Sequence, residues 1–247
     1  EQNRQRQGDE DRRGHDVERP LGGPEAGRRA GAANGNQRKT RHLMADVEFE
    51  RGGLAPALAA LGDARGAPDV AKRYELAMRA GDVPAAAESR ARLAGGTVEE
   101  LLELASADER LERFAAALPL LEKALAADPS SGELRFRTAI ALERTGRFEA
   151  SVKIFSALIV DEPDHAPALN YLGYMQIERG AEVEQGLALV RRALLIDPNN
   201  GAYVDSLGWG LYRLGRFAEA SAVLERASRL LPSDSTVRAR RYSGLAW

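Results

Sequence analysis

The residues Gly201–Pro232 read GAYVDSLGWGLYRLGRFAEASAVLERASRLLP, and this stretch contains two amphipathic segments joined by Leu214-Gly215-Arg216. Small and apolar residues recur at steps of three and four in both segments: Val204, Leu207, Gly208 and Leu211, then Phe217, Ala220, Leu224 and Ala227. Such steps place the residues on one face of an α-helix. Gly208 and Ala220 are small, so the two helices can approach closely. The stretch therefore predicts a helical hairpin.

The same pattern recurs upstream, and prolines mark its period. They stand at Pro129, Pro163, Pro198 and Pro232, so the spacings are 163 − 129 = 34, 198 − 163 = 35 and 232 − 198 = 34. Proline cannot continue a helix, so each one ends a unit. The predicted units are 98–131, 132–165, 166–200 and 201–232. One hairpin cannot bury its apolar face alone, whereas stacked hairpins build a continuous core.

Three local signals predict where helices begin. Thr97 with Glu100, and Ser130 with Glu133, have the spacing of a capping box, in which a hydroxyl and a carboxylate satisfy backbone N–H groups reciprocally. Asp82 is a predicted N-cap, since Pro84 follows in the first turn, where its missing N–H costs little.

The ends of the chain differ from its centre. Residues 38–97 predict looser, alanine-rich helical hairpins, degenerate relatives of the later units. Residues 1–37 are polar and charged with few apolar residues, so they are predicted to be a disordered polar and basic tail. Residues 233–247 predict a capping or truncated helix that would cover the last hairpin.

A helix–turn–helix period of 34 residues with these signature residues resembles the tetratricopeptide repeat (TPR) family. The signature positions of the last unit include Gly208, Phe217, Ala220 and Ala227. In the third unit Gly186 replaces the family's usual alanine, and in the first unit Asp108 replaces an aromatic residue. The resemblance implies an all-α fold, a right-handed solenoid of stacked hairpins.

The resemblance also implies a concave groove lined by the first helix of each hairpin. The positions that project into such a groove correspond to Asn170, Tyr174, Ile177, Asp205, Trp209, Tyr212 and Arg213. Aromatic side chains beside polar ones suit the binding of a peptide or helical segment. The predicted function is a protein–protein interaction scaffold or adaptor. Trp209 and Tyr212 could also be partly core, while Tyr171, Tyr203 and Phe217 are predicted to pack between helices.

Two further hypotheses follow from the repeats. An end hairpin exposes apolar surface, so the chain could be a structural or self-associating assembly subunit. Residues 165–232 are also similar to bacterial envelope TPR lipoproteins, some of which act as adaptors that deliver substrates to proteases. The chain has no lipobox cysteine, and both a cytoplasmic and a bacterial envelope location remain open.

Composition and motifs exclude several classes of function. The chain has 247 residues, a formal net charge of −2 and no cysteine, so thiolate metal sites and cysteine nucleophiles are absent. The basic residues of the tail alternate with acidic ones and lack aromatic neighbours, so no nucleic acid partner is expected. No apolar run has the length of a transmembrane segment.

The sequence predicts no catalytic activity, no cofactor and no metal site. The glycine pairs lack the strand–turn–helix context of a phosphate-binding loop. His165 stands beside Asp161, Glu162 and Asp164, but this spacing matches no known type of metal site. We interpret that segment as a turn between two units, and we expect a protein or peptide partner.

Overall fold

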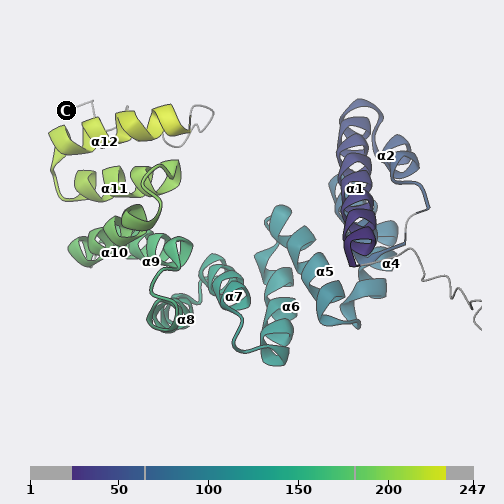
Figure 1. The fold of residues 1–247 in the computed structure, drawn as a ribbon, viewed down its shortest axis with the longest axis horizontal. Helices are drawn as coiled ribbons and strands as arrows, with labels where there is room; N and C mark the ends of the chain where they lie inside the picture. The colour runs from purple at the N-terminus through teal and green to yellow at the C-terminus, as the bar shows by residue number, and fades with distance from the viewer. Residues whose placement is uncertain (1–23, 64, 181, 232–247) are drawn as a thin grey trace, which may run out of the picture. The chain divides into compact units, whose positions relative to one another are not determined.

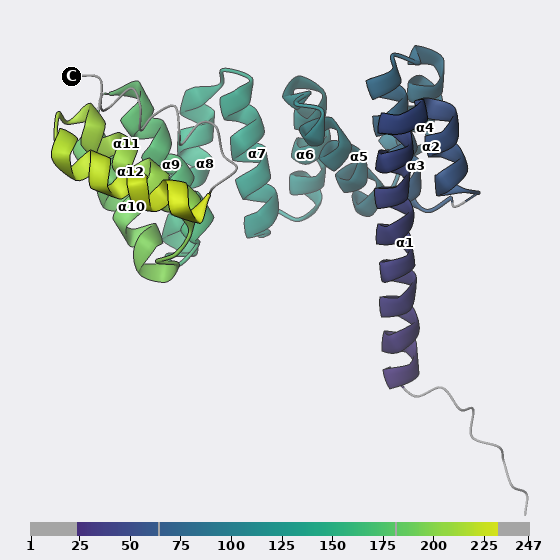
Figure 2. The same cartoon turned by 90° about the horizontal axis from the view of Figure 1, so that it is seen from above.

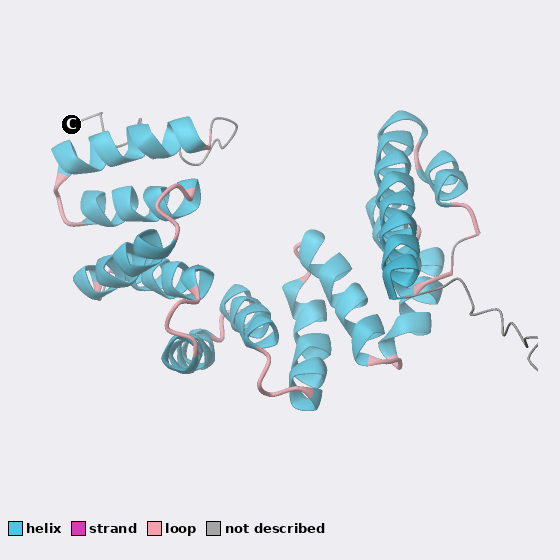
Figure 3. Cartoon of the chain, viewed as in Figure 1, coloured by secondary structure: helices cyan, strands magenta, loops and turns pink. Residues whose placement is uncertain are grey.

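The computed structural model describes residues 24–63, 65–180 and 182–231, and side chains from Asn34 onward. Within these ranges the regular secondary structure is entirely α-helical (Figure 3). The chain divides into two compact units, residues 1–64 and 65–247, with the boundary at Ala64. The prediction of an all-α fold is confirmed.

The first unit is a pair of contacting helices, α1 (Pro24–Gly52) and α2 (Leu54–Leu61). Helix α1 begins at Pro24, so residues 24–37 are helical rather than part of a disordered tail, and residues 1–23 lie outside the described range. The sequence prediction depended on apolar burial. It overlooked that alanine, arginine, lysine and glutamine favour helix, and that extending a helix costs far less than nucleating one.

The second unit is a series of five hairpins. They comprise α3 (Ala67–Ala80) with α4 (Val83–Ala94), α5 (Val98–Arg110) with α6 (Phe114–Ala127), α7 (Gly132–Arg144) with α8 (Phe148–Asp161), α9 (Ala166–Arg179) with α10 (Val183–Ile196), and α11 (Gly201–Arg213) with α12 (Phe217–Leu230). Each hairpin contacts the next one along the chain (Figures 1 and 2). The predicted helix at 233–247 lies outside the described residues.

Local signals position most helix ends as predicted. Thr97 and Glu100 form a complete capping box, and the carboxylate of Asp82 accepts from the backbone N–H of Ala85 at 3.1 Å. The predicted box at Ser130 is wrong by one residue. Ser130 donates to Asp128 instead, and Ser131 is the residue that caps α7, by accepting from the Leu134 N–H at 3.3 Å.

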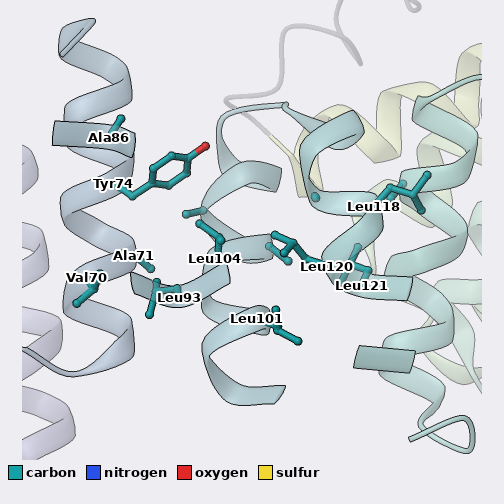
Figure 4. Packing of buried hydrophobic residues seen from close by; sticks show 14 of the residues in the cluster. Val70, Ala71, Tyr74, Ala86, Leu93, Leu101, Leu104, Leu118, Leu120 and Leu121 are labelled. Atoms are coloured by element: carbon teal, nitrogen blue, oxygen red, sulfur yellow. The ribbon is translucent and has the colours of Figure 1, made fainter. Parts of the chain in front are cut away.

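The core of the hairpins α3–α6 is apolar, and the fully buried carboxylate of Asp108 lies within it. Figure 4 shows side chains of this cluster, including Tyr74, Leu104 and Leu121, between neighbouring helices. Asp108 on α5 is fully buried, and it accepts from the Tyr74 hydroxyl at 2.5 Å, from Arg90 Nη1 at 2.6 Å and from Arg113 Nε at 3.2 Å. This network compensates the cost of burying a carboxylate. Tyr74 and the Asp108 that accepts from it are 34 residues apart, one repeat period.

Helices α9 and α10 approach unusually closely. A Cβ atom on Gly186 would lie 2.5 Å from the carbonyl oxygen of Gly173, and one on Gly173 would lie 2.6 Å from that of Gly186. Only glycine at both positions allows this contact, which explains why Gly186 replaces the family's alanine. The close packing brings the side chains near the end of α9 into the core.

Candidate functional site: the surface of the first helices

A row of glutamates links the first helix of each hairpin to the first helix of the next. Each accepts a hydrogen bond: Glu75 Oε2 from Arg110 Nε at 2.8 Å, Glu109 Oε2 from Arg137 Nη2 at 2.6 Å, Glu143 Oε2 from the Tyr171 hydroxyl at 3.1 Å, and Glu178 Oε2 from Trp209 Nε1 at 2.5 Å. The glutamates are spaced by 109 − 75 = 34, 143 − 109 = 34 and 178 − 143 = 35 residues, the period of the repeats. We call this set the glutamate row.

The last member of the glutamate row makes two contacts with α11. Besides the bond from Trp209, the backbone carbonyl of Glu178 accepts from Arg213 Nη1 at 2.9 Å. The guanidinium carbon of Arg213 lies 5.7 Å from the centroid of the Trp209 ring, within reach of a cation–π interaction. Because a helix C-terminus leaves carbonyl groups unpaired, a cation is favourable at this end of α9. Trp209 and Arg213 are therefore both bonded to the end of α9.

Three aromatic side chains follow one another from the end of α11 to the start of α12, and we call them the aromatic row. Trp209 and Tyr212 stack with centroids 5.3 Å apart and an interplanar angle of 16°, and Tyr212 meets Phe217 edge-on at 5.5 Å. Phe217 has half of its surface exposed (50%). The row thus ends in an accessible ring.

The exposure of Phe217 contrasts with its equivalents in earlier hairpins. Phe114 and Phe148 also begin a second helix, and each is covered by an arginine from the next hairpin. Arg144 stands 4.7 Å from the Phe114 centroid, and Arg179 stands 4.8 Å from that of Phe148. Among the described residues no arginine covers Phe217 in this way. The prediction that Phe217 packs between helices is therefore wrong for half of its surface.

The structure places the predicted site residues in three kinds of position. Arg213 is exposed, while Tyr212, Tyr174 and Asn170 are partly buried. Trp209 is also partly buried, and it packs against the apolar cluster of α9 and α10 as well as joining the aromatic row. Asp205 has only 7% of its surface exposed, so it offers little contact area to a partner.

The prediction that Ile177 lines the groove is wrong. Its side chain is fully buried among Val183, Leu187 and Val190. The physical reason is close backbone approach, because a Cβ on Gly186 or on Gly210 would lie within 3.0 Å of Ile177. Glycines on both neighbouring helices bring this position of α9 into the core.

Two residues at this surface lie outside the groove positions predicted from the sequence. The groove positions predicted from the sequence do not include Glu178, although the recurrence of glutamate at 75, 109, 143 and 178 is visible in the sequence. Phe217 was assigned to the core, because no sequence signal shows that half of its surface is exposed. Tyr171 is partly buried and donates to Glu143. Burial, together with the charge and the hydrogen bond of Glu143, raises the pKa of the Tyr171 hydroxyl.

Three observations bear on other kinds of site in the described parts of the chain. No group of three or more His, Cys, Asp or Glu residues there could hold a metal ion. His165 is the N-cap of α9, where its Nδ1 accepts from the backbone N–H of Ala168 at 3.1 Å. Within residues 24–63, 65–180 and 182–231, no helix combines the length and apolarity needed to cross a membrane.

Comparison with known proteins agrees with this geometry. The family model of the tetratricopeptide repeat matches residues 110–175. A TPR repeat-containing protein of Pseudomonas aeruginosa is 26% identical over 169 residues, which are 67% of this chain but 29% of that protein. The chain thus spans less than a third of the length of this relative.

Two solved structures share the fold. A tetratricopeptide repeat protein from Parabacteroides merdae superposes with a TM-score of 0.56 at 15% identity, covering 72% of each chain. A thermophilic TPR protein of Thermus thermophilus gives a TM-score of 0.51 at 21% identity, covering 61% of this chain and 100% of the other. With the repeat period and the stacked hairpins, these matches show that the chain has a tetratricopeptide repeat fold.

Proposed function

We propose that this TPR protein binds a peptide or helical segment of a partner protein on the surface of its first helices. The tetratricopeptide fold is in general a scaffold for protein–protein interaction. The observation that carries the more specific proposal is the aromatic row, Trp209, Tyr212 and Phe217, which ends in a half-exposed ring. Asn170 and Tyr174 on α9 and Arg213 on α11 complete the proposed surface.

Preorganisation supports this assignment. Aromatic rings give large contact areas, and ordering flexible side chains at an interface costs free energy. Here the stacking of Tyr212 on Trp209, and the bond from Trp209 to Glu178, hold two rings in place before any partner arrives. A partner would therefore lose little affinity to ordering this surface.

The charges around the aromatic row are largely paired within the chain. Arg216 binds Glu219 through two hydrogen bonds of 2.8 and 2.6 Å, and this pairing lowers the pKa of Glu219. Arg213 is engaged by the carbonyl of Glu178. The proposed partner segment accordingly presents apolar or aromatic side chains as its anchors, with polar groups at the edge.

The test is partner capture from the source organism with matched variants. Tyr212→Ala combined with Phe217→Ala removes the outer rings while keeping Trp209, which also packs in the core. Phe148→Ala is the control, because it occupies the same position of an earlier hairpin. We expect the double variant to lose a partner that wild type and control retain, at equal helical content. Equal capture by all three proteins would overturn the proposal.

A second candidate, self-association, is favoured by one observation. Phe217 and Leu230 on α12 are both exposed, at 50% and 37%. Contact between two copies through either end of this helix would cover one of them. Sedimentation velocity over a wide concentration range would then show a dimer that Phe217→Ala weakens, whereas a monomer at every concentration contradicts this candidate.

A further inference from the structure

An apolar groove lies between the second helices α6 and α8, with α7 as its floor. It has a volume of about 640 Å³. Leu125 and Ala126 form one wall, Ile154 and Ala157 form the other, and Thr138 and Leu142 lie at the bottom. None of these residues belongs to the aromatic row or to the glutamate row, so the groove is separate from the surface proposed above.

Thr138 at the floor is a buried polar residue with an unused donor. Only 1% of it is exposed, and its Oγ1 has no hydrogen-bond partner among the described residues. Two other hydroxyls inside first helices bond back to the preceding turn, Ser106 to Leu102 O at 2.7 Å and Ser206 to Ala202 O at 3.0 Å. An unsatisfied buried hydroxyl costs free energy, so it indicates an acceptor that a ligand supplies.

The charged residues around the groove are mostly cationic. Three basic residues and one acidic residue line it: Arg135, Arg147, Lys153 and Glu122. Arg147 pairs with Glu122 at 3.1 Å and Arg135 with Asp161 at 2.6 Å. Lys153 forms no ion pair within the described residues. Lys153 is therefore the rim cation that complements an acidic group beside the apolar part of an occupant.

The shape of the groove fits a helix. Along α8 its wall is formed by Ala150, Ile154 and Ala157, which are spaced i, i+4 and i+7 and extend over about 10 Å. Amphipathic helices bind such grooves through side chains at the same spacing. We propose that this groove binds an amphipathic helix of a partner protein, with leucine-like anchors, glutamates along one edge and a short polar side chain that accepts from Thr138.

The test uses a synthetic alanine-rich helical peptide with leucines at i, i+4 and i+7, serine at i+3 and flanking glutamates. Methyl NMR of the full chain is recorded during titration. We expect saturable shifts at Leu125, Leu142 and Ile154. Ala157→Trp, which fills the groove, should weaken binding about tenfold or more, while Ala127→Trp, also exposed but outside the groove, should stay within about twofold of wild type.

Two further comparisons test the charge and the hydroxyl. Lys153→Glu should lower the affinity for the glutamate-flanked peptide and raise the affinity for a lysine-flanked one. Lys123→Glu on α6 should change neither affinity. Replacing the peptide serine by alanine should weaken binding to wild type but not to Thr138→Val, in a double-mutant cycle. Circular dichroism melts establish that each variant is folded.

Three results would overturn the proposal. They are the absence of saturable shifts at the groove methyls, equal binding by Ala157→Trp, and binding of dodecanoate where the peptide does not bind. The last result would assign the groove to a fatty-acid-like ligand instead. A serine advantage that persists in Thr138→Val would overturn the role of that hydroxyl.

Discussion

Trp209 on α11 donates its indole N–H to the carboxylate of Glu178 on α9, with Nε1 and Oε2 2.5 Å apart. The bond joins the last two hairpins at the point where the aromatic row begins. It repeats, with a different donor, the contact that the other members of the glutamate row make. A structural link of the solenoid and an element of the proposed binding surface are therefore the same pair of residues.

We expect Glu178→Gln to weaken this link without unfolding the chain. The bond joins partly exposed groups, so the expected loss is about 1 kcal/mol in the free energy of unfolding. Chemical denaturation of Glu178→Gln, Trp209→Phe and the double variant forms a cycle that isolates the pair. Strictly additive losses would show that the contact contributes nothing of its own.

Substitution of the buried Asp108 should lower the free energy of unfolding by more than Glu178→Gln does. Asp108→Asn leaves Arg90 and Arg113 without their charged partner, and breaking a buried ion pair costs about 3–5 kcal/mol. Leucine occupies the equivalent positions 142 and 211, so Asp108→Leu with Arg90→Leu should recover much of the loss. Urea titration measures the free energy of unfolding of Asp108→Asn and of the paired variant. If the paired change is no better than Asp108→Asn, the network contributes more than charge compensation.

Gly186→Ala should destabilise the chain although alanine is the family's usual residue there. Its Cβ would lie 2.5 Å from the Gly173 oxygen, and overpacking of this kind costs about 1–3 kcal/mol, only partly offset by the better helix propensity of alanine, about 1 kcal/mol. Gly95→Ala is the control, since a Cβ there would meet nothing within 4 Å. A higher melting temperature for Gly186→Ala would contradict the close approach of α9 and α10.

Alkaline pH should destabilise the fold through Tyr171. Its folded pKa is raised, mainly by burial and then by Glu143, above the ordinary value of 10.0. A raised folded pKa stabilises the fold fully below the unfolded pKa, and this stability is lost as pH rises through the folded pKa. The melting temperature of wild type should therefore fall above pH 10, and that of Tyr171→Phe should fall less. An identical alkaline fall in both proteins would assign the effect to other groups.

The sequence by itself determined the hairpins and most of their ends. The apolar spacing, the prolines two residues beyond α6, α8 and α10, and the caps at Asp82 and Thr97 all act within a few residues of the backbone they control. The glutamate row was equally readable, because its members recur at the repeat period. Local chemistry is sufficient for such features.

Only the tertiary structure decided which side chains the solenoid leaves accessible. Ile177 is buried because glycines on α10 and α11 let the helices approach, while Phe217 is exposed because no described arginine covers it. The groove above Thr138 likewise depends on how far α6 and α8 stand apart. Exposure is a property of the distance between neighbouring helices, which no short sequence pattern contains.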